Sequence, residues 1–314
     1  MTTVSAVSAQ YGDVLHECVA CKAEEISYWR RKNFQYTENA NNEEFHIYRC
    51  NSCGTGFLNR PPHLAWLQSI YQYSGQALTQ SITLEDVLAR EAEFPNCTVD
   101  AARMSRQADS FNHSGNVLAL DIGSGFGFYT QALRQLSYRT ASINPGTYEN
   151  EVFRELNGDV PLPVMLENYE ASGQFGIVMM SQVLEHLLEP DKAINKVSRM
   201  MVPGGVLACA VPNYHSFLVK LLGTKDNACL WVPEHVNYFS VKGLKALVES
   251  NGFRVIKVEQ ITRIPFNALS KRLRLKGRTA SVIDGLVNSV QKPFAALMHC
   301  FGLGIYINLY AVKQ

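Results

Sequence analysis

A short buried strand followed at once by a glycine-rich turn constrains the fold of this chain more than any other feature of its sequence. The apolar run Val117-Leu118-Ala119-Leu120 leads directly into Asp121-Ile122-Gly123-Ser124-Gly125-Phe126-Gly127, and the apolar spacing of 129–136 then predicts a helix. Glycines let a backbone turn tightly and approach a ligand closely, and the amides at a helix N-terminus attract anionic groups. This order predicts either a nucleotide-type binding site or a purely structural turn in an α/β fold.

Strands and helices alternate along the chain from residue 116. The sequence predicts strands at 139–143, 164–166, 175–180, 206–211, 253–258 and 305–312, and helices at 149–156, 183–201 and 241–251. Alternation at this spacing predicts a Rossmann-like α/β fold, in which helices cover both faces of a parallel sheet. Ligands of such sheets bind at the carboxyl ends of the strands, and Asp121 is expected at one of these ends.

The spacing of the glycines distinguishes a dinucleotide-binding turn from other nucleotide-type turns. Dinucleotide sites expect G-x-G-x-x-G, whereas Gly127 comes one residue early, which disfavours NAD. The segment LALDIGSGFG instead resembles motif I of the class I methyltransferases that depend on S-adenosylmethionine (SAM). FGIVMMSQVLEHLLEP, MVPGGVLACAVPN, and EHVNYFS followed by ESNGFRVI resemble later segments of the same family, in the same order.

This resemblance covers residues 116–260 and the final strand. It implies a seven-stranded sheet whose last strand is antiparallel, and a SAM site formed by Asp121, Gly123, Ser124, Gly125 and Gly127. It also implies that Gln182 lies beside the cofactor and the substrate.

Two polar residues of the implied cofactor site are less certain from the sequence. Family members usually end the second strand with an acidic residue that binds the ribose, and Asn144 stands there instead. An amide can still accept one hydrogen bond, so weaker ribose binding is expected rather than none. Glu167 is a candidate for the adenine side, and a solvated loop carboxylate is the alternative.

Two Cys-x-x-Cys pairs lie in the first part of the chain, Cys18 with Cys21 and Cys50 with Cys53. Four thiolates from two tight turns suit the tetrahedral coordination of Zn²⁺ and leave no open position, so the predicted zinc is structural. The N-terminal sequence lacks the features of a secretory signal, and no apolar run is long enough to cross a membrane. We therefore expect a cytoplasmic protein with reduced cysteines.

The segment around the second cysteine pair makes the resemblance to methyltransferases more specific. YRCNSCGTGFLNRPP followed by SIYQYSG resembles the zinc-ribbon leader of a methyltransferase group that includes sugar C-methyltransferases acting on nucleotide-linked keto sugars. His186 in VLEHLL and the Glu234-His235 pair in EHVNYFS match as well. The C-terminal domain of that group has no counterpart in this sequence, and Val232 stands where the group tends to have a tyrosine.

Methyl transfer from a sulfonium requires alignment of donor and acceptor, and an oxygen or carbon acceptor must also lose a proton. Histidine suits this task because its unperturbed pKa is about 6.5. We expect His235 to be the base, with Glu234 orienting its ring or taking the proton, and His186 as the second candidate. Structural roles remain open for both histidines. Three further residues are candidate substrate contacts, with packing as the alternative: Tyr73, His215 and Tyr238.

These patterns divide the chain into a zinc-ribbon module at 1–70, a helical connection at 71–115 and a SAM-binding domain at 116–314. The last part includes an insertion at 262–303 that begins with basic residues and then becomes apolar. The insertion is interpreted as a helical lid with a basic wall for a phosphate-bearing substrate, as the surface of a homodimer, or as a solvated face. Its first basic residues are Arg263, Lys271, Arg272, Arg274, Lys276 and Arg278.

The leading interpretation is an enzyme that transfers a methyl group from SAM to an oxygen or carbon of a sugar derivative or another specialised metabolite. The runner-up is an RNA methyltransferase that holds its substrate with the ribbon. The 29 basic and 28 acidic residues give a formal charge of +1, so a nucleic-acid partner is not expected. A third interpretation is an inactive SAM-binding scaffold, because Asn144 and Gly176 replace residues that are usually acidic in the family.

Overall fold

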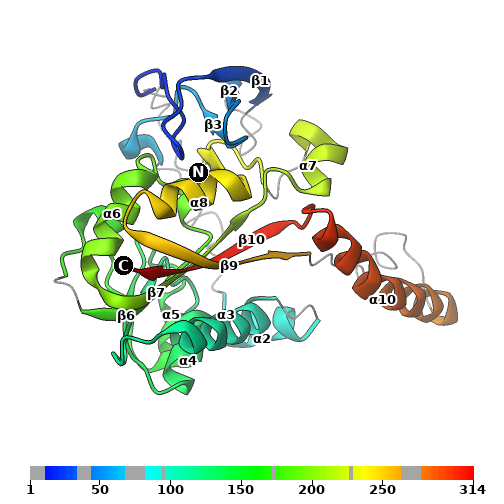
Figure 1. Ribbon diagram of the computed structural model, residues 1–314. Coiled ribbons are helices and arrows are strands. Elements are labelled where there is room, and N and C mark those ends of the chain that lie inside the picture. Colours follow the sequence, from blue (N-terminus) through cyan, green and yellow to red (C-terminus); the bar gives the residue numbers. More distant parts are fainter. Residues whose placement is uncertain are drawn as a thin grey trace, which may run out of the picture.

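The structure is a computed structural model, and it describes residues 11–33, 44–67, 82–93, 96–171, 174–225, 229–262 and 277–314. Within these ranges a large sheet has the strand order β5-β4-β6-β7-β10-β9. Figure 1 labels β6, β7, β10 and β9 of this sheet. β5, β4, β6 and β7 run parallel, and β10 lies antiparallel between β7 and β9. The predicted Rossmann-like sheet with an antiparallel last strand is confirmed. Its strands are β4 (Leu118–Ile122), β5 (Arg139–Ile143), β6 (Phe175–Ser181), β7 (Met201–Pro212), β9 (Phe253–Ile261) and β10 (Tyr306–Lys313).

The strand predicted at 164–166 is wrong. The chain there makes one parallel bridge, between Ile143 and Leu162, and then forms the short 3₁₀ helix η1 (Leu166–Asn168). Pro161 and Pro163 flank Leu162 and lack the N–H that a continuous ladder needs, which accounts for pairing at a single residue. The large sheet therefore has six strands in the described part of the chain, where seven were predicted.

Helices cover both faces of this sheet because successive strand residues point to opposite sides. Leu120 and Val178 pack toward α6 (Pro190–Met200) and α8 (Val241–Glu249). Their neighbours Ala119 and Ile177 pack toward α3 (Cys97–Phe111) and α4 (Phe128–Gln135). Two further helices, α2 (Leu84–Glu93) and α5 (Asn150–Asn157), pack against α4. Figure 1 shows α3 and α4 below the sheet and α8 above it.

The helix predicted at 183–201 is shorter than expected. The 3₁₀ helix η2 (Leu184–His186) precedes it, and α6 begins only at Pro190. Proline suits the first position of a helix because the N–H it lacks has no partner there. Glu185 and His186 consequently belong to a turn just after the carboxyl end of β6, where ligands of this fold bind.

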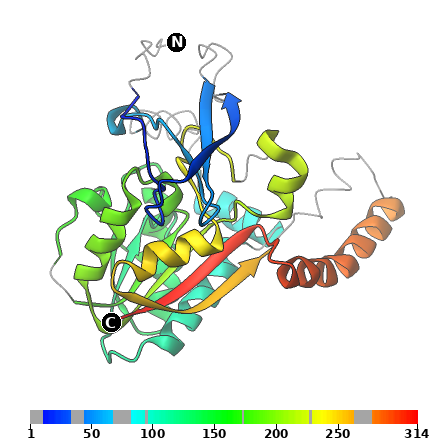
Figure 2. The same ribbon diagram turned by 45° about the horizontal axis from the view of Figure 1, so that its top comes forward.

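A second, antiparallel sheet has the order β1-β2-β3-β8. Its first three strands come from the N-terminal part: β1 (Ile26–Asn33), β2 (Glu44–Cys50) and β3 (Gly56–Leu58). The fourth, β8 (Asn237–Tyr238), comes from the loop before α8 and pairs with β3 through Phe57 and Gly56. Figure 2 shows this small sheet standing over the face of the large sheet that carries α8. The cysteine-rich segment is therefore joined by backbone pairing to the part of the chain that holds Glu234 and His235.

The remaining described helices are α7 (Phe217–Leu222), η3 (Gly223–Lys225) and α10 (Gly277–Cys300). α10 projects away from the large sheet (Figure 1), and the Phe294 ring contacts that of Phe217 at a centroid distance of 5.3 Å. Most of the basic residues predicted to line this insertion, those at 263–276, lie outside the described residues, as does Tyr73. Among the described helices none is long and apolar enough to cross a membrane.

Candidate functional site

The glycine turn connects β4 to α4 at the carboxyl edge of the sheet. The amides of Gly123 and Ser124 donate to the carbonyl oxygen of Ile143, at 2.9 and 3.2 Å, which ties the turn to the end of β5. Gly127 precedes α4 with φ +88°, and a Cβ there would lie 2.2 Å from Nδ2 of Asn157. A side chain here would be strained by the positive φ and would require Asn157 to move, so this position favours glycine.

Two features of the turn fit a bound cofactor. The hydroxyl of Ser124 is buried and has no hydrogen-bond partner among the described residues. Gly125 has φ +49°, and a Cβ placed on it would meet no atom within 4 Å. A buried polar atom without a partner beside open space at the N-terminus of a helix suits a polar ligand such as the amino-acid end of SAM.

Asp121 lies beneath this turn and is almost fully buried. Burial raises the pKa of its carboxyl group to about 6, and the Thr130 hydroxyl, which donates to Oδ2 at 2.7 Å, opposes this rise. A buried carboxylate becomes more stable when a cation approaches it. Asp121 is therefore suited to contact the ammonium group of SAM.

Asn144 directly follows β5 and is buried, and its side-chain amide already donates two hydrogen bonds. Its Nδ2 donates to the carbonyl oxygen of Gly146 at 3.0 Å and to Oε2 of Glu149 at 3.3 Å. The fold thus brings a carboxylate to the place where the sequence shows an amide. The sequence does not point to Glu149, because it comes five residues after Asn144 and reaches it only through the bend that begins α5.

Of two other predicted cofactor residues, Gln182 lies at the same edge of the sheet and Glu167 lies beside α6. Gln182 follows β6 with φ +56°, and its backbone amide donates to the carbonyl oxygen of Ala210 at 2.8 Å. Positive φ in a residue other than glycine is strained and is often found at functional sites. Glu167 has an exposed side chain in η1, and its carbonyl oxygen accepts a hydrogen bond from the Lys196 ammonium at 2.8 Å.

The predicted catalytic histidines lie together. The rings of His186 and His235 form an edge-to-face pair with centroids 4.7 Å apart. Nδ1 of His186 lies 3.0 Å from the carbonyl oxygen of Glu234, and Nδ1 of His235 lies 2.7 Å from that of Cys229. Burial lowers the pKa of His186 to about 3 and that of His235 to about 4, so both rings are neutral near pH 7.

The histidine pair lies close to the cofactor side of the sheet. The side chain of Val183 would touch a Cβ placed on Gly123 at 2.6 Å, and His186 follows Val183 in the same turn. Burial raises the pKa of the Tyr148 hydroxyl, and the carboxylates of Glu149 and then Glu234 raise it further. The Tyr148 ring also contacts the Phe126 ring of the glycine turn, with centroids 6.3 Å apart. The glycine turn and the loop that carries His235 therefore face one region.

Two predicted substrate contacts have internal partners. The Tyr238 hydroxyl is buried and donates to the carbonyl oxygen of His235 at 2.7 Å. Nε2 of His215 lies 3.1 Å from the carbonyl oxygen of Gly54 in the cysteine-rich segment. Tyr238 thus supports the loop of His235 directly, and His215 joins the segment after β7 to the small sheet.

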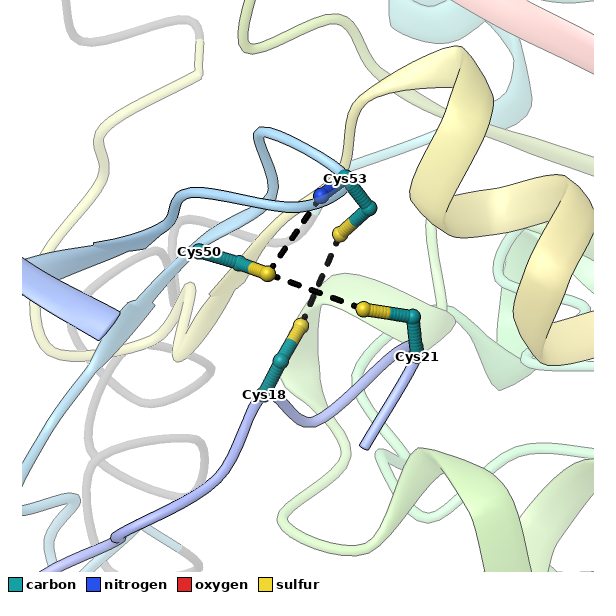
Figure 3. A group of neighbouring side chains, drawn as sticks. All are labelled: Cys18, Cys21, Cys50 and Cys53. Carbon is teal, nitrogen blue, oxygen red and sulfur yellow. Dashed lines mark hydrogen bonds between the residues drawn. The ribbon is translucent and has the colours of Figure 1, made fainter. Parts of the chain in front are cut away.

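The four predicted metal ligands converge at the end of the small sheet (Figure 3). Their sulfur atoms all lie within 4.8 Å of one another, with Cys18 and Cys53 at 3.6 Å and Cys21 and Cys50 also at 3.6 Å. Zinc–sulfur bonds of about 2.3 Å in a tetrahedron place the sulfur atoms about 3.8 Å apart. The cluster therefore has the dimensions of a tetrathiolate metal site.

The cysteine cluster is packed against the start of α8. The Ser240 hydroxyl donates to the carbonyl oxygen of Cys53 at 2.7 Å, and it accepts from the amide of Gly243 at 2.9 Å. A Cβ on Gly243 would lie 1.9 Å from Oγ1 of Thr55, so α8 is in close contact with the turn (or knuckle) that holds Cys50 and Cys53. The loop before α8 is thus held at one end by the cysteine cluster.

Comparison with known proteins agrees with this geometry. A family model described as "Methyltransferase domain" matches residues 84–258, which is more than half of the chain. The chain belongs to this methyltransferase domain family. With the fold and the named relatives, the match makes the protein a SAM-dependent methyltransferase, and SAM is the cofactor expected of this family.

Two relatives illustrate the range of acceptors among similar methyltransferases. The chain is 26% identical over 188 residues to a ubiquinone biosynthesis O-methyltransferase of Rhodopseudomonas palustris strain HaA2, covering 56% of this chain and 73% of the relative. It is 27% identical over 146 residues to the C-methyltransferase NovU of Streptomyces niveus, covering 45% of this chain and 34% of the relative. Among solved structures, a SAM-dependent methyltransferase from Thermotoga maritima, described as a possible histamine N-methyltransferase, aligns with a TM-score of 0.48. The two are 18% identical, and the alignment covers 74% of this chain and 98% of that one.

Proposed function

We propose that this methyltransferase transfers the methyl group of SAM to an oxygen or carbon of a small molecule, such as a sugar derivative or another specialised metabolite. The observation that carries the proposal is the His186–His235 pair, in which His186 belongs to the same turn as Val183, the side chain packed against Gly123. The names of the O- and C-methyltransferase relatives support an acceptor of this kind. Both types of acceptor lose a proton during the reaction, and a neutral histidine is suited to take it.

The proposed roles follow from the contacts of each residue. Asp121, Ser124 and the glycines at 123, 125 and 127 hold the amino-acid end of SAM, while Glu149 and Asn144 bind the ribose hydroxyls. Gln182 and Glu167 are proposed to contact the cofactor as well. His235 takes the acceptor's proton, with its ring held by the carbonyl of Cys229, and Glu234 and His186 flank it. When it is bound, SAM supplies the electrophilic methyl group, and the chain aligns the acceptor with it.

We also propose that Cys18, Cys21, Cys50 and Cys53 bind one structural Zn²⁺. The tetrahedral spacing of the sulfur atoms supports this assignment. So do the amides of Ala20 and Cys53, which point at Sγ of Cys18 and of Cys50, each at 3.4 Å. Such amides stabilise thiolates, the form in which cysteine binds zinc.

Isothermal titration with SAM tests the cofactor site, and release of S-adenosylhomocysteine tests the reaction. We expect saturable SAM binding with a dissociation constant between about 1 µM and 1 mM. A panel of hydroxylated aromatic compounds and of free and nucleotide-linked sugars then identifies the acceptor. Absence of SAM binding at millimolar concentration would overturn the proposed function. SAM binding without turnover on any acceptor would favour the alternative of an inactive SAM-binding scaffold.

Replacing Glu149 with glutamine is expected to weaken SAM binding about tenfold, or by about 1.4 kcal/mol. The substitution keeps the size of the side chain and removes the negative charge, so hydrogen bonds from the ribose hydroxyls become neutral and weaker. Titration calorimetry measures the change. Glu151→Gln is the matched control, because Glu151 is exposed in α5 and pairs with Arg154. Equal SAM affinities for the two variants would remove Glu149 from the cofactor site.

A further inference from the structure

Glu185 forms a three-residue cluster with the histidine pair. One nitrogen of each ring and one oxygen of Glu185 all lie within 4.8 Å of one another. Glu185 and His186 come from η2, and His235 comes from the loop before β8. The Val236 amide donates to the carbonyl oxygen of Glu185 at 2.8 Å, and the Asn237 side chain donates to that of Leu184 at 3.1 Å. Backbone and side-chain hydrogen bonds thus fix the two segments against each other.

The carboxyl group of Glu185 is the unexplained member of this cluster. The residue is 1% exposed, and neither carboxyl oxygen has a hydrogen-bond partner among the described residues. Burial raises the pKa of this carboxyl to about 8. Protonation alone does not satisfy the group, because a neutral carboxylic acid still needs an acceptor for its O–H. A buried polar group without a partner is costly, so an additional species bound to these oxygens is expected.

The histidines are arranged to offer lone pairs. Each Nδ1 faces a backbone carbonyl, that of Glu234 for His186 and that of Cys229 for His235, so each Nδ1 carries the hydrogen. In the neutral ring the lone pair then lies on Nε2. Histidines that bind metals commonly have this arrangement, in which the other ring nitrogen donates to a carbonyl or carboxylate.

We propose that Glu185, His186 and His235 bind a divalent transition-metal ion, at a site separate from the four cysteines. Two neutral imidazoles and one carboxylate form a ligand set suited to Fe²⁺, Mn²⁺ or Zn²⁺ with coordination positions left open. The cation gives the Glu185 oxygens the partner that the described residues do not provide. The four-thiolate cluster, in contrast, has sulfur ligands only and no open position.

The catalytic role of this metal ion rests on the proposed function, methyl transfer to an oxygen or carbon acceptor. A cation at this point polarises an acceptor oxygen and makes its proton easier to remove. With the cation bound, Nε2 of each ring would hold it and accept no proton, and His235 takes the acceptor's proton itself only in the metal-free protein. Metal binding by the cluster can be measured independently of SAM and of any acceptor.

Titration of the zinc-loaded full chain with Mn²⁺, followed by electron paramagnetic resonance, tests this site. Mn²⁺ prefers oxygen and nitrogen ligands and does not displace zinc from thiolates, so its binding reports the second site. We expect one Mn²⁺ per chain in the wild type and at least about tenfold weaker binding in Glu185→Gln. Glu189→Gln is the matched control and should bind like the wild type, because Glu189 is exposed and pairs with Lys192.

Two results would overturn the metal site: no Mn²⁺ binding by the wild type at millimolar concentration, or equal binding by Glu185→Gln and the wild type. His235→Asn serves as a second variant if Glu185→Gln does not fold, and it should also lose Mn²⁺. SAM titration of the same samples separates the two proposals. Normal SAM binding without Mn²⁺ binding refutes the metal site and leaves the methyl-transfer proposal standing.

Discussion

Replacing His235 with alanine is expected to lower the rate of S-adenosylhomocysteine formation by about a hundredfold. The imidazole is held by the carbonyl oxygen of Cys229 at 2.7 Å. Burial lowers its pKa to about 4, so the ring is neutral near pH 7 and is a weaker base than a solvent-exposed histidine. The variant removes the proposed proton acceptor but leaves the glycine turn intact. The SAM dissociation constant should therefore stay within about a factor of two of the wild type, while the rate at saturating SAM falls.

His46→Ala is the control for this prediction. His46 lies on β2, is exposed and pairs with Glu44 at 3.0 Å, so its loss should change neither the rate nor SAM binding. Initial rates are compared at equal protein concentration with the acceptor found in the screen. A His235→Ala enzyme as fast as the wild type would show that this imidazole does not take part in the reaction.

The cofactor turn could be predicted from the sequence because its determinants are local. The apolar run before Asp121, the glycines after it and the helix that follows lie within about twenty residues, and each needs a specific backbone conformation. The structure shows β4, the turn and α4 in this order. The same holds for the cysteine pairs, since each knuckle is a single tight turn.

The two carboxylates beside the sites, buried Glu185 and half-buried Glu149, could not be predicted in this way. Glu185 is defined by its distance from His235, fifty residues later in the chain, and by the absence of a hydrogen-bond partner among the described residues. Glu149 reaches Asn144 only because the chain bends into α5. Residue spacing carries no information on such contacts, because tertiary packing sets them.

One departure from the family pattern has a local packing reason. Gly176 stands where the family usually has an aspartate, and a Cβ there would lie 2.4 Å from the carbonyl oxygen of Asn116. β6 therefore has no room for a side chain at this position. The glycine reflects a close backbone contact at the start of the strand, far from its carboxyl end, and it gives no support to an inactive scaffold.

Replacing Cys50 with serine is expected to release the proposed zinc and to lower the melting temperature by roughly 10 °C or more. Structural zinc contributes on the order of 10 kcal/mol to small metal-binding domains, and loss of about half of that would shift the melting temperature of a chain of this size by this amount. Cys50 is fully buried at the end of β2, and its amide donates to the carbonyl oxygen of Thr55 at 2.9 Å. Without the metal, the turn between β2 and β3 loses its main constraint.

The same substitution should impair methyl transfer more than SAM binding, because β3 pairs with β8 and Ser240 bonds to the carbonyl of Cys53. Loosening of the knuckle releases the loop that carries Glu234 and His235, whereas the glycine turn belongs to the large sheet. Metal analysis, thermal melting, the rate of S-adenosylhomocysteine formation and SAM titration test this prediction together. Cys300→Ser is the control, since Cys300 is exposed at the end of α10. A Cys50→Ser protein that kept its zinc and its melting temperature would refute the four-cysteine site. A Cys50→Ser protein that lost zinc but kept its rate of methyl transfer would show that the cysteine-rich segment does not position His235.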